Sequence, residues 1–214
     1  MTSETQRGEA ARLTLPVGER DHAQGPTDAA VTLVEYGDFE CPYCRAAVPI
    51  VDELRRRLGD QLLHVFRHFP VVKLHPHAQH AAEAAEAAGA QGKFFEMHGV
   101  LFEHQEALAD DDLARYAAEL DLDGDRFGRE LRSHAHAGRV REDFRSGVAA
   151  GVRGTPTFYL DGLRYDGLVG VPQLMAAIRA GHPDLVDEES ARAGTPRPIP
   201  RVVRQRTPYG PESA

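Results

Sequence analysis

The sequence predicts an α/β domain that carries an inserted block of helices. Two observations indicate this class. A strand, a helix and a second strand follow one another over residues 31–67, and a β-hairpin pattern appears only after a long helical stretch at 78–150. The chain has 214 residues, which suits one domain with an insertion and terminal segments.

The opening of the domain has the pattern of a β-α-β unit. Residues 31–36 are mostly apolar and β-branched, as is typical of a buried strand. Residues 42–58 place apolar side chains at helical spacing, and a Gly-Asp pair ends that pattern. A second strand is expected over 61–67, so the two strands would be parallel with the helix as their crossover. Pro49 falls inside the predicted helix and should kink it.

The middle of the chain is predicted to be wholly helical, as an insertion over about 72–150. The alanine-rich run 78–90 has high helix propensity. Further helices are expected over 93–106, from Asp110 or Asp111 to Leu120, and from Asp123 or Asp125 past Val140.

The last part of the domain combines a hairpin with a helix. Asp161-Gly162 separates the runs Thr-Phe-Tyr-Leu and Leu-Arg-Tyr, and Asp-Gly between two such runs is a strong hairpin signal. A final helix is expected to open at Val171-Pro172.

Both ends of the chain have the composition of unstructured segments. We predict a disordered leader over 1–24, a folded domain over 25–182 and a disordered tail rich in Pro and Arg over 183–214. Arginines between 197 and 206 could contact an acidic partner, although a solvated tail is the simpler interpretation.

Composition excludes several classes of function. A formal net charge of −8 argues against nucleic acid as the main partner. No apolar run approaches the ~20 residues that span a membrane, so no membrane association is expected. The first thirty residues contain no apolar segment typical of a secretory signal, so we expect a cytoplasmic protein.

The only two cysteines, Cys41 and Cys44, stand three positions apart where a strand ends and a helix begins. Unpaired N–H groups and the helix dipole stabilise a negative charge there, and the thiolate is the nucleophilic form of cysteine. Cys44 lies one turn further along the same face, so it could attack a mixed disulfide formed at Cys41. Pro42 suits the first helical turn because it needs no N–H partner.

Two other interpretations of this pair remain open. The cysteines could be small buried core residues, or half of a metal site shared between subunits. One Cys-x-x-Cys pair lacks the four ligands of a structural zinc site. We therefore expect redox chemistry and no metal at the pair.

Glu35 interrupts an apolar strand, six residues before Cys41. A buried carboxylate holds its proton more tightly than an exposed one, so Glu35 could exchange a proton with Cys44. In the alternative interpretation, its side chain reaches solvent at the end of the strand.

Two further patterns have weaker signals. Thr155-Pro156 follows a glycine and leads into a strand, a pattern that by itself indicates an ordinary loop proline. His75, His77 and His80, with His68 nearby, form a candidate zinc or copper cluster. Because no carboxylate completes this histidine set, a loop and helix cap is the simpler interpretation.

Taken together, these motifs resemble those of DsbA-like thioredoxin-fold proteins. The resemblance rests on four segments and extends over roughly 25–182. The segments are VEYGDFECPYC at 34–44, FRHFP at 66–70, HPHA at 75–78 and GTPTF at 154–158.

The resemblance implies a thioredoxin-like fold with an inserted helical subdomain. Pro156 would be a cis proline facing the cysteine pair, and Thr155 and Pro156 would offer backbone groups to an extended substrate. Glu35 would match the buried acid of the family, and Pro49 the kink in its first helix. We expect Pro42 and Tyr43 to contact substrate as well.

The sequence departs from the family pattern in two respects. The Pro-Tyr dipeptide between the cysteines is similar to that of glutaredoxins and differs from the Pro-His of strongly oxidising periplasmic members. An export signal is also absent from the sequence. Both departures argue against a periplasmic disulfide donor.

The sequence therefore predicts a thiol–disulfide oxidoreductase that acts on protein or small-molecule thiols and disulfides. No resident cofactor is expected, and glutathione is a candidate co-substrate. The alternatives are a non-catalytic redox sensor or binding module, and a glutathione-dependent transferase or isomerase. The retained cysteine pair disfavours the last of these. The sequence gives no indication of the oligomeric state.

Overall fold

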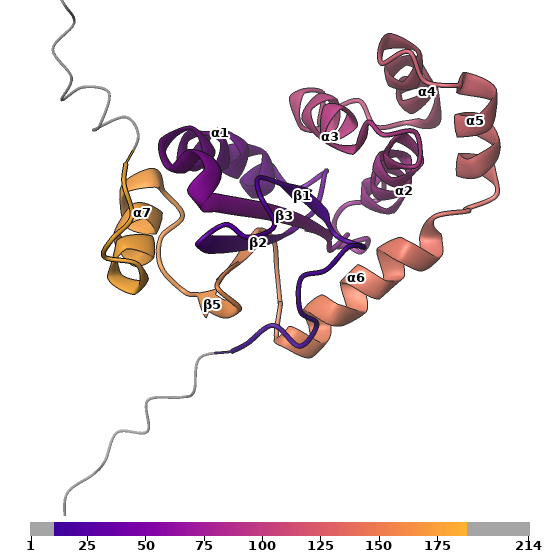
Figure 1. Cartoon of the computed structure of the whole chain (residues 1–214). Helices are drawn as coiled ribbons and strands as arrows, with labels where there is room; N and C mark the ends of the chain where they lie inside the picture. Colours follow the sequence, from indigo (N-terminus) through magenta and orange to yellow (C-terminus); the bar gives the residue numbers. More distant parts are fainter. Residues whose placement is uncertain (1–10, 188–214) are drawn as a thin grey trace, which may run out of the picture.

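A five-stranded mixed sheet forms the centre of the molecule in a computed structural model, which describes residues 11–187 (Figure 1). The strand order is β1-β3-β2-β4-β5, and only β2 and β3 run parallel. The strands are β1 (His22–Gln24), β2 (Val31–Gly37), β3 (Leu62–His68), β4 (Thr157–Leu160) and β5 (Leu163–Tyr165).

Seven α-helices lie within the described residues. They are α1 (Pro42–Leu58), α2 (Ala78–Gly89), α3 (Phe94–Glu103), α4 (Asp110–Glu119), α5 (Gly124–Arg132), α6 (Ala137–Ala150) and α7 (Val171–Gly181), and a short 3-10 helix η1 (Gly59–Gln61) follows α1. The predicted β-α-β unit and hairpin are confirmed. None of the helices in this part of the chain is long and apolar enough to cross a membrane.

The two faces of the sheet are covered by different helices. Leu33 of β2 faces a core shared with α1 and α7, whereas its neighbour Val34 faces a core that includes Ala150 at the end of α6. This alternation is expected for a strand buried on both faces. The inward side chains of α1 follow helical spacing, and Pro49 lies inside the helix.

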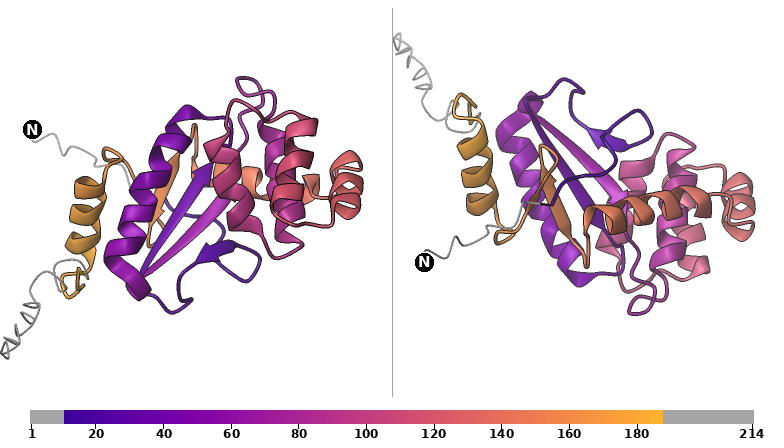
Figure 2. Two further views of the ribbon diagram at one scale, coloured as in Figure 1. Left: turned by 90° about the horizontal axis from the view of Figure 1, so that it is seen from above. Right: turned by 90° about the horizontal axis from the view of Figure 1, so that it is seen from below.

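The inserted helices form the far end of the molecule from α7 (Figure 2). Their core consists of alanines of α2 packed against aromatic and aliphatic side chains of α3, α4 and α5, and it includes both cysteines. The predicted helix from 123 past Val140 is wrong in one respect, because it is divided into α5 and α6. His134 adopts a positive φ of 52° between them, which no continuing helix permits.

The predicted disordered leader is wrong for residues 11–24. His22–Gln24 pair with β3 as an edge strand, and the buried guanidinium of Arg67 holds the segment before it. Arg67 donates to Asp21 at 2.8 and 2.9 Å and to the carbonyl of Leu15 at 2.9 Å. Asp21, a polar residue of this segment, thus supplies the charge partner of a buried cation. Residues 1–10 lie outside the described residues.

The predicted disordered tail is wrong for residues 183–187. Residues 183–187 are described, and Val186 exchanges two hydrogen bonds with the Gln61 side chain, at 2.6 and 3.0 Å. The rest of the predicted tail, including its arginines at 197–206, lies outside the described residues.

Candidate active site

The cysteine pair lies at the N-terminus of α1, where the sequence placed it. Cys41 is the N-cap residue, and its carbonyl accepts hydrogen bonds from the N–H groups of Cys44 at 3.1 Å and Arg45 at 3.2 Å. Both cysteines are free thiols. Cys41 is 4% exposed and Cys44 is fully buried, so only Cys41 can meet an approaching substrate.

Cys41 is the more acidic of the two thiols. A hydrogen bond from the Cys44 thiol, a hydrogen bond with Thr155 and the backbone N–H groups of Cys44 and Tyr43 lower the pKa of Cys41 to about 5, although burial opposes them. When it is protonated, the Cys41 thiol can donate to the Thr155 carbonyl oxygen, which lies 3.3 Å from its sulfur, but the low pKa makes the ionised form the main one. Cys41 is therefore a thiolate at neutral pH.

The pKa of Cys44 is shifted in the opposite direction. Burial raises its pKa well above the usual value, and the hydrogen bond to Cys41 and the negative charge of Glu35 add to this effect. The N–H of Asp38 donates to the Cys44 sulfur at 3.4 Å. The pair thus combines a slightly exposed thiolate with a protonated thiol that is fully buried behind it.

Thr155 and Pro156 lie opposite the pair, as the resemblance implied, and their peptide bond is cis. Beside them is a hollow of about 340 Å³ with mostly apolar walls. Tyr43, 74% exposed, forms part of its rim. The hollow is lined by Tyr43, Ala46, Ala47, Ile50, Thr155, Pro156 and Val169. Pro42 is exposed next to Tyr43.

Glu35 is buried on β2, 4% exposed, which excludes the alternative in which its side chain reaches solvent. One carboxylate oxygen lies 3.4 Å from Nε2 of His64 on β3. Both residues line a cavity of about 160 Å³, which also contacts His98 and the polar side chains of Asp52 and Arg55. Burial, with the nearby imidazole of His64, lowers the pKa of His98 to about 3.

The candidate histidine cluster predicted from spacing does not assemble. Nδ1 of His75 lies within hydrogen-bond distance of Oδ2 of Asp38, at 2.8 Å, beside the cysteines. His80 pairs with Asp110 at 2.7 Å, and the backbone N–H of His77 donates to Glu40 at 2.7 Å. His68 points to a different group of residues, with His22 and Glu86.

Two residues near the pair were not recognised from the sequence as part of the site. Asp38 directly follows β2, and its carboxylate accepts the N–H groups of Glu40 at 2.8 Å and Val71 at 2.7 Å. Gln105, after α3, donates to the carbonyls of Phe39 and Cys41, both at 2.8 Å. The second contact joins segments 64 residues apart, so no local pattern could reveal it.

The family model described as Thioredoxin matches residues 18–180. The chain belongs to the thioredoxin family. Among solved structures, it is similar to BdbD from Bacillus subtilis, with 21% identity, a TM-score of 0.73 and coverage of 81% of this chain and 98% of that one. A thioredoxin-like oxidoreductase from Silicibacter pomeroyi DSS-3 has 27% identity and a TM-score of 0.69 over 78% of this chain and 94% of that one. The predicted DsbA-like thioredoxin fold is thereby confirmed.

Longer sequence relatives contain a similar segment. The Na⁺/H⁺ antiporter NhaA 1 of Mycobacterium sp. (strain KMS) is 46% identical over 79% of this thioredoxin-family chain and 28% of its own length. NhaA 3 of Salinispora tropica is 49% identical over 78% of this chain and 26% of its own length. The chain thus spans about a quarter of these relatives.

Proposed function

We propose that this thioredoxin-family protein is a thiol–disulfide oxidoreductase in which Cys41 is the nucleophile and Cys44 resolves the intermediate. The observation that carries the proposal is the opposite shift of the two pKa values. Cys41 has a pKa near 5, whereas burial holds Cys44 protonated. The pair also lies at the N-terminus of α1 beside the cis Thr155-Pro156 bond, and a nucleophilic thiolate with a protonated thiol behind it suits stepwise exchange.

The first step is attack of the Cys41 thiolate on a substrate disulfide. A bond forms between the Cys41 sulfur and one substrate sulfur, the substrate S–S bond breaks, and the other substrate sulfur leaves as a thiolate. Thr155 and Pro156 flank the reacting sulfur. The exposed backbone there can pair with an extended peptide segment, and the apolar hollow can take a neighbouring side chain.

The second step requires the Cys44 thiol to lose its proton. Glu35 is the proposed acceptor, because it is buried and close enough for its charge to act on Cys44. The Cys44 thiolate then attacks the Cys41 sulfur, a Cys41–Cys44 disulfide forms, and the second substrate sulfur leaves and takes a proton. Two electrons pass from the pair to the substrate, and the reverse sequence oxidises a dithiol.

We propose protein disulfides as the main substrates and no resident cofactor, with glutathione able to serve as a small co-substrate. A cytoplasmic location, expected from the sequence, would favour reduction or isomerisation, because the glutathione pool there is reducing. For this two-electron couple, about 30 mV of potential difference corresponds to about 1.4 kcal/mol.

Insulin reduction with a dithiol donor tests the assignment of the two cysteines. Cys41→Ser should abolish turnover, and Cys44→Ala, incubated with the disulfide substrate in the absence of the dithiol donor, should accumulate mixed disulfides at Cys41, visible by mass spectrometry. Turnover that survives in Cys41→Ser would refute the nucleophile. A reduction potential measured on the same protein gives the direction of exchange.

A further inference from the structure

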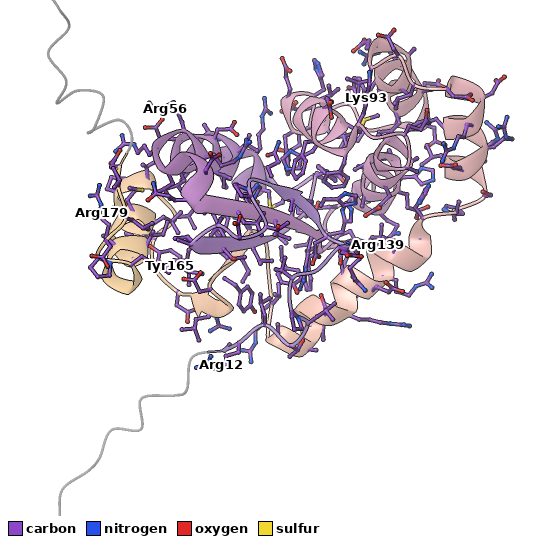
Figure 3. The ribbon with its side chains drawn as sticks, viewed as in Figure 1. Arg12, Arg56, Lys93, Arg139, Tyr165 and Arg179 are labelled. Atoms are coloured by element: carbon purple, nitrogen blue, oxygen red, sulfur yellow. The ribbon has the colours of Figure 1, made fainter. Side chains whose placement is uncertain are left out.

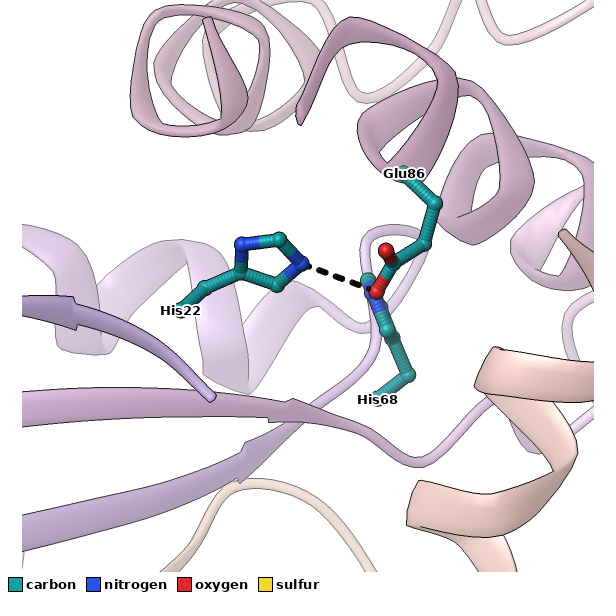
Figure 4. A group of neighbouring side chains, drawn as sticks. All are labelled: His22, His68 and Glu86. Atoms are coloured by element: carbon teal, nitrogen blue, oxygen red, sulfur yellow. Dashed lines mark hydrogen bonds and ion pairs between the residues drawn. The ribbon is translucent and has the colours of Figure 1, made fainter. Parts of the chain in front are cut away.

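Three metal-binding side chains converge at the junction between the sheet and the helical insertion. His22 comes from β1, His68 from the end of β3 and Glu86 from α2 (Figure 4). Nε2 of His22 lies 3.0 Å from Oε1 of Glu86, and Nε2 of His68 lies 2.9 Å from the same oxygen. The three candidate ligand atoms all lie within 4.8 Å of one another.

The group is largely removed from solvent. The side chains of His68 and Glu86 are 1% and 8% exposed, and that of His22 is 20% exposed. Burial would raise the pKa of Glu86, but hydrogen bonds with His22 and His68 outweigh it and bring the pKa well below the usual range. Glu86 is therefore a carboxylate, and it faces two imidazole nitrogens.

We propose that His22, His68 and Glu86 bind a zinc ion or a similar divalent transition-metal ion. Two imidazoles and one carboxylate form a ligand set that zinc accepts, with metal–ligand distances of about 2.0–2.2 Å. In a tetrahedral site, ligands at such distances are about 3.3–3.6 Å apart, so the two separations from Glu86 Oε1, now 3.0 and 2.9 Å, would have to widen by only a few tenths of an ångström. Water can supply the fourth ligand on the side of His22, the most exposed of the three.

Metal binding through Nε2 would replace the hydrogen bonds of both imidazoles to Glu86 with metal–ligand bonds. An imidazole binds through Nε2 when its proton is on Nδ1. Nδ1 of His68 is buried and has no hydrogen-bond partner among the described residues, so its N–H would be unpaired in the metal-bound form, a cost that the metal–ligand bond must outweigh. The His22 ring is stacked on Phe94 with centroids 3.5 Å apart, which holds its orientation.

Arg139 is the cation that could compete for this carboxylate. It projects from α6 (Figure 3), and its Nε lies 3.8 Å from Oε1 of Glu86. Arg139 also pairs closely with the buried carboxylate of Asp143. It therefore keeps an anionic partner when a metal ion takes Glu86.

The proposed ion would join β1 and β3 to the first helix of the insertion. It would act as a structural clamp between the two parts of the domain, and it does not depend on the redox function of the cysteines. Because such an ion binds the folded chain, it should raise thermal stability with the logarithm of its concentration over Kd.

The test uses the full chain with Cys41→Ser and Cys44→Ser, so that thiolates cannot bind the metal. Titration with Zn²⁺ by calorimetry should show one ion per chain. A 100-fold excess over Kd should raise Tm by about 5–10 °C. Co²⁺ should give a visible absorption band from a nitrogen and oxygen site, and Mg²⁺ should have no effect.

Substitution of the proposed ligands tests whether the ion binds at this site. In the same background, His22→Ala should weaken Zn²⁺ binding by more than about tenfold, as loss of a ligand exceeds loss of an outer-shell partner. Glu86→Gln keeps the size of the side chain and should weaken binding as well. His182→Ala is the matched control, since His182 pairs with Asp161 at 2.7 Å elsewhere on the chain. Absence of binding, or equal binding by all three variants, would overturn the proposal.

Discussion

His75 Nδ1 lies 2.8 Å from Oδ2 of Asp38, and this pair is held beside the sulfur of Cys41. Burial disfavours a charge on His75, but the hydrogen bond and the charge of Asp38 raise its pKa, and Cys41 adds to this. The Asp38 carboxylate also accepts the N–H groups of Glu40 and Val71. One buried carboxylate thus connects the loop before the cysteines with the loop that follows β3.

The His75 imidazole is expected to help keep Cys41 ionised. A positive charge near a thiolate favours the charged form, so His75→Ala should raise the pKa of Cys41 by up to about one unit. The pKa can be measured from the ultraviolet absorbance of the thiolate during a pH titration. The control is His77→Ala, because His77 is exposed and its backbone, not its ring, makes the contact with Glu40. An equal shift in both variants would contradict a specific role.

The low pKa of Cys41 should also make the stability of the reduced protein depend on pH. Its pKa falls from 9.0 to about 5 in the folded chain, so between these values the unfolded state binds more protons. The free energy of unfolding should therefore increase as pH rises from about 5 to 9, and this contribution is lost as pH falls through 5. Urea denaturation of the reduced protein measures it. Cys41→Ser should lack the same increase, and a constant difference between the two proteins across this window would refute the assignment.

Glu35 should act in the second step of exchange only. Glu35→Gln keeps the size of the side chain but removes the proton acceptor, so resolution by Cys44 should slow by about a hundredfold, the low end for general acid–base catalysis. Attack by Cys41 on the substrate should be little changed. Rapid-quench measurement of the mixed disulfide separates the two rates.

Glu40→Gln provides the matched control, since Glu40 is adjacent to Cys41 in sequence and accepts the N–H of His77. It should leave the rate of resolution unchanged. Equal slowing of both steps in Glu35→Gln would indicate a general structural role for Glu35 instead of proton transfer.

Local patterns in the sequence predicted the parts of the fold whose causes are local. The strand at 31–36, the helix at 42–58 and the hairpin around Asp161-Gly162 each carry their own periodicity or turn residues. The split between α5 and α6 was missed because a single histidine, unlike a glycine, is also compatible with a continuing helix, so its residue type alone does not mark the positive φ at His134.

The residues of the candidate sites also divide into those that a local sequence pattern indicates and those that only the fold brings together. Cys41, Cys44 and Glu35 were found because they are close in sequence and of informative types. His22 and Glu86 were missed because they meet His68 only when β1 and α2 pack against the end of β3. β1 itself was missed because it is a polar edge strand of three residues, and its position depends on long-range contacts of Arg67.

Arg67 should be the residue that fixes the N-terminal segment to the domain. Its side chain is fully buried and pairs with Asp21, whose carboxylate is also buried. Arg67→Met would leave Asp21 without its charge partner and free the carbonyls of Leu15 and Pro16, so the free energy of unfolding should fall by about 3–5 kcal/mol. Urea denaturation measures this loss, and Arg115→Met, which removes an exposed arginine, should show none. If Arg67→Met is as stable as Arg115→Met, the prediction is wrong and other contacts hold residues 11–24. In that case the double variant Arg67→Met with Asp21→Asn should have the same free energy of unfolding as Arg67→Met alone.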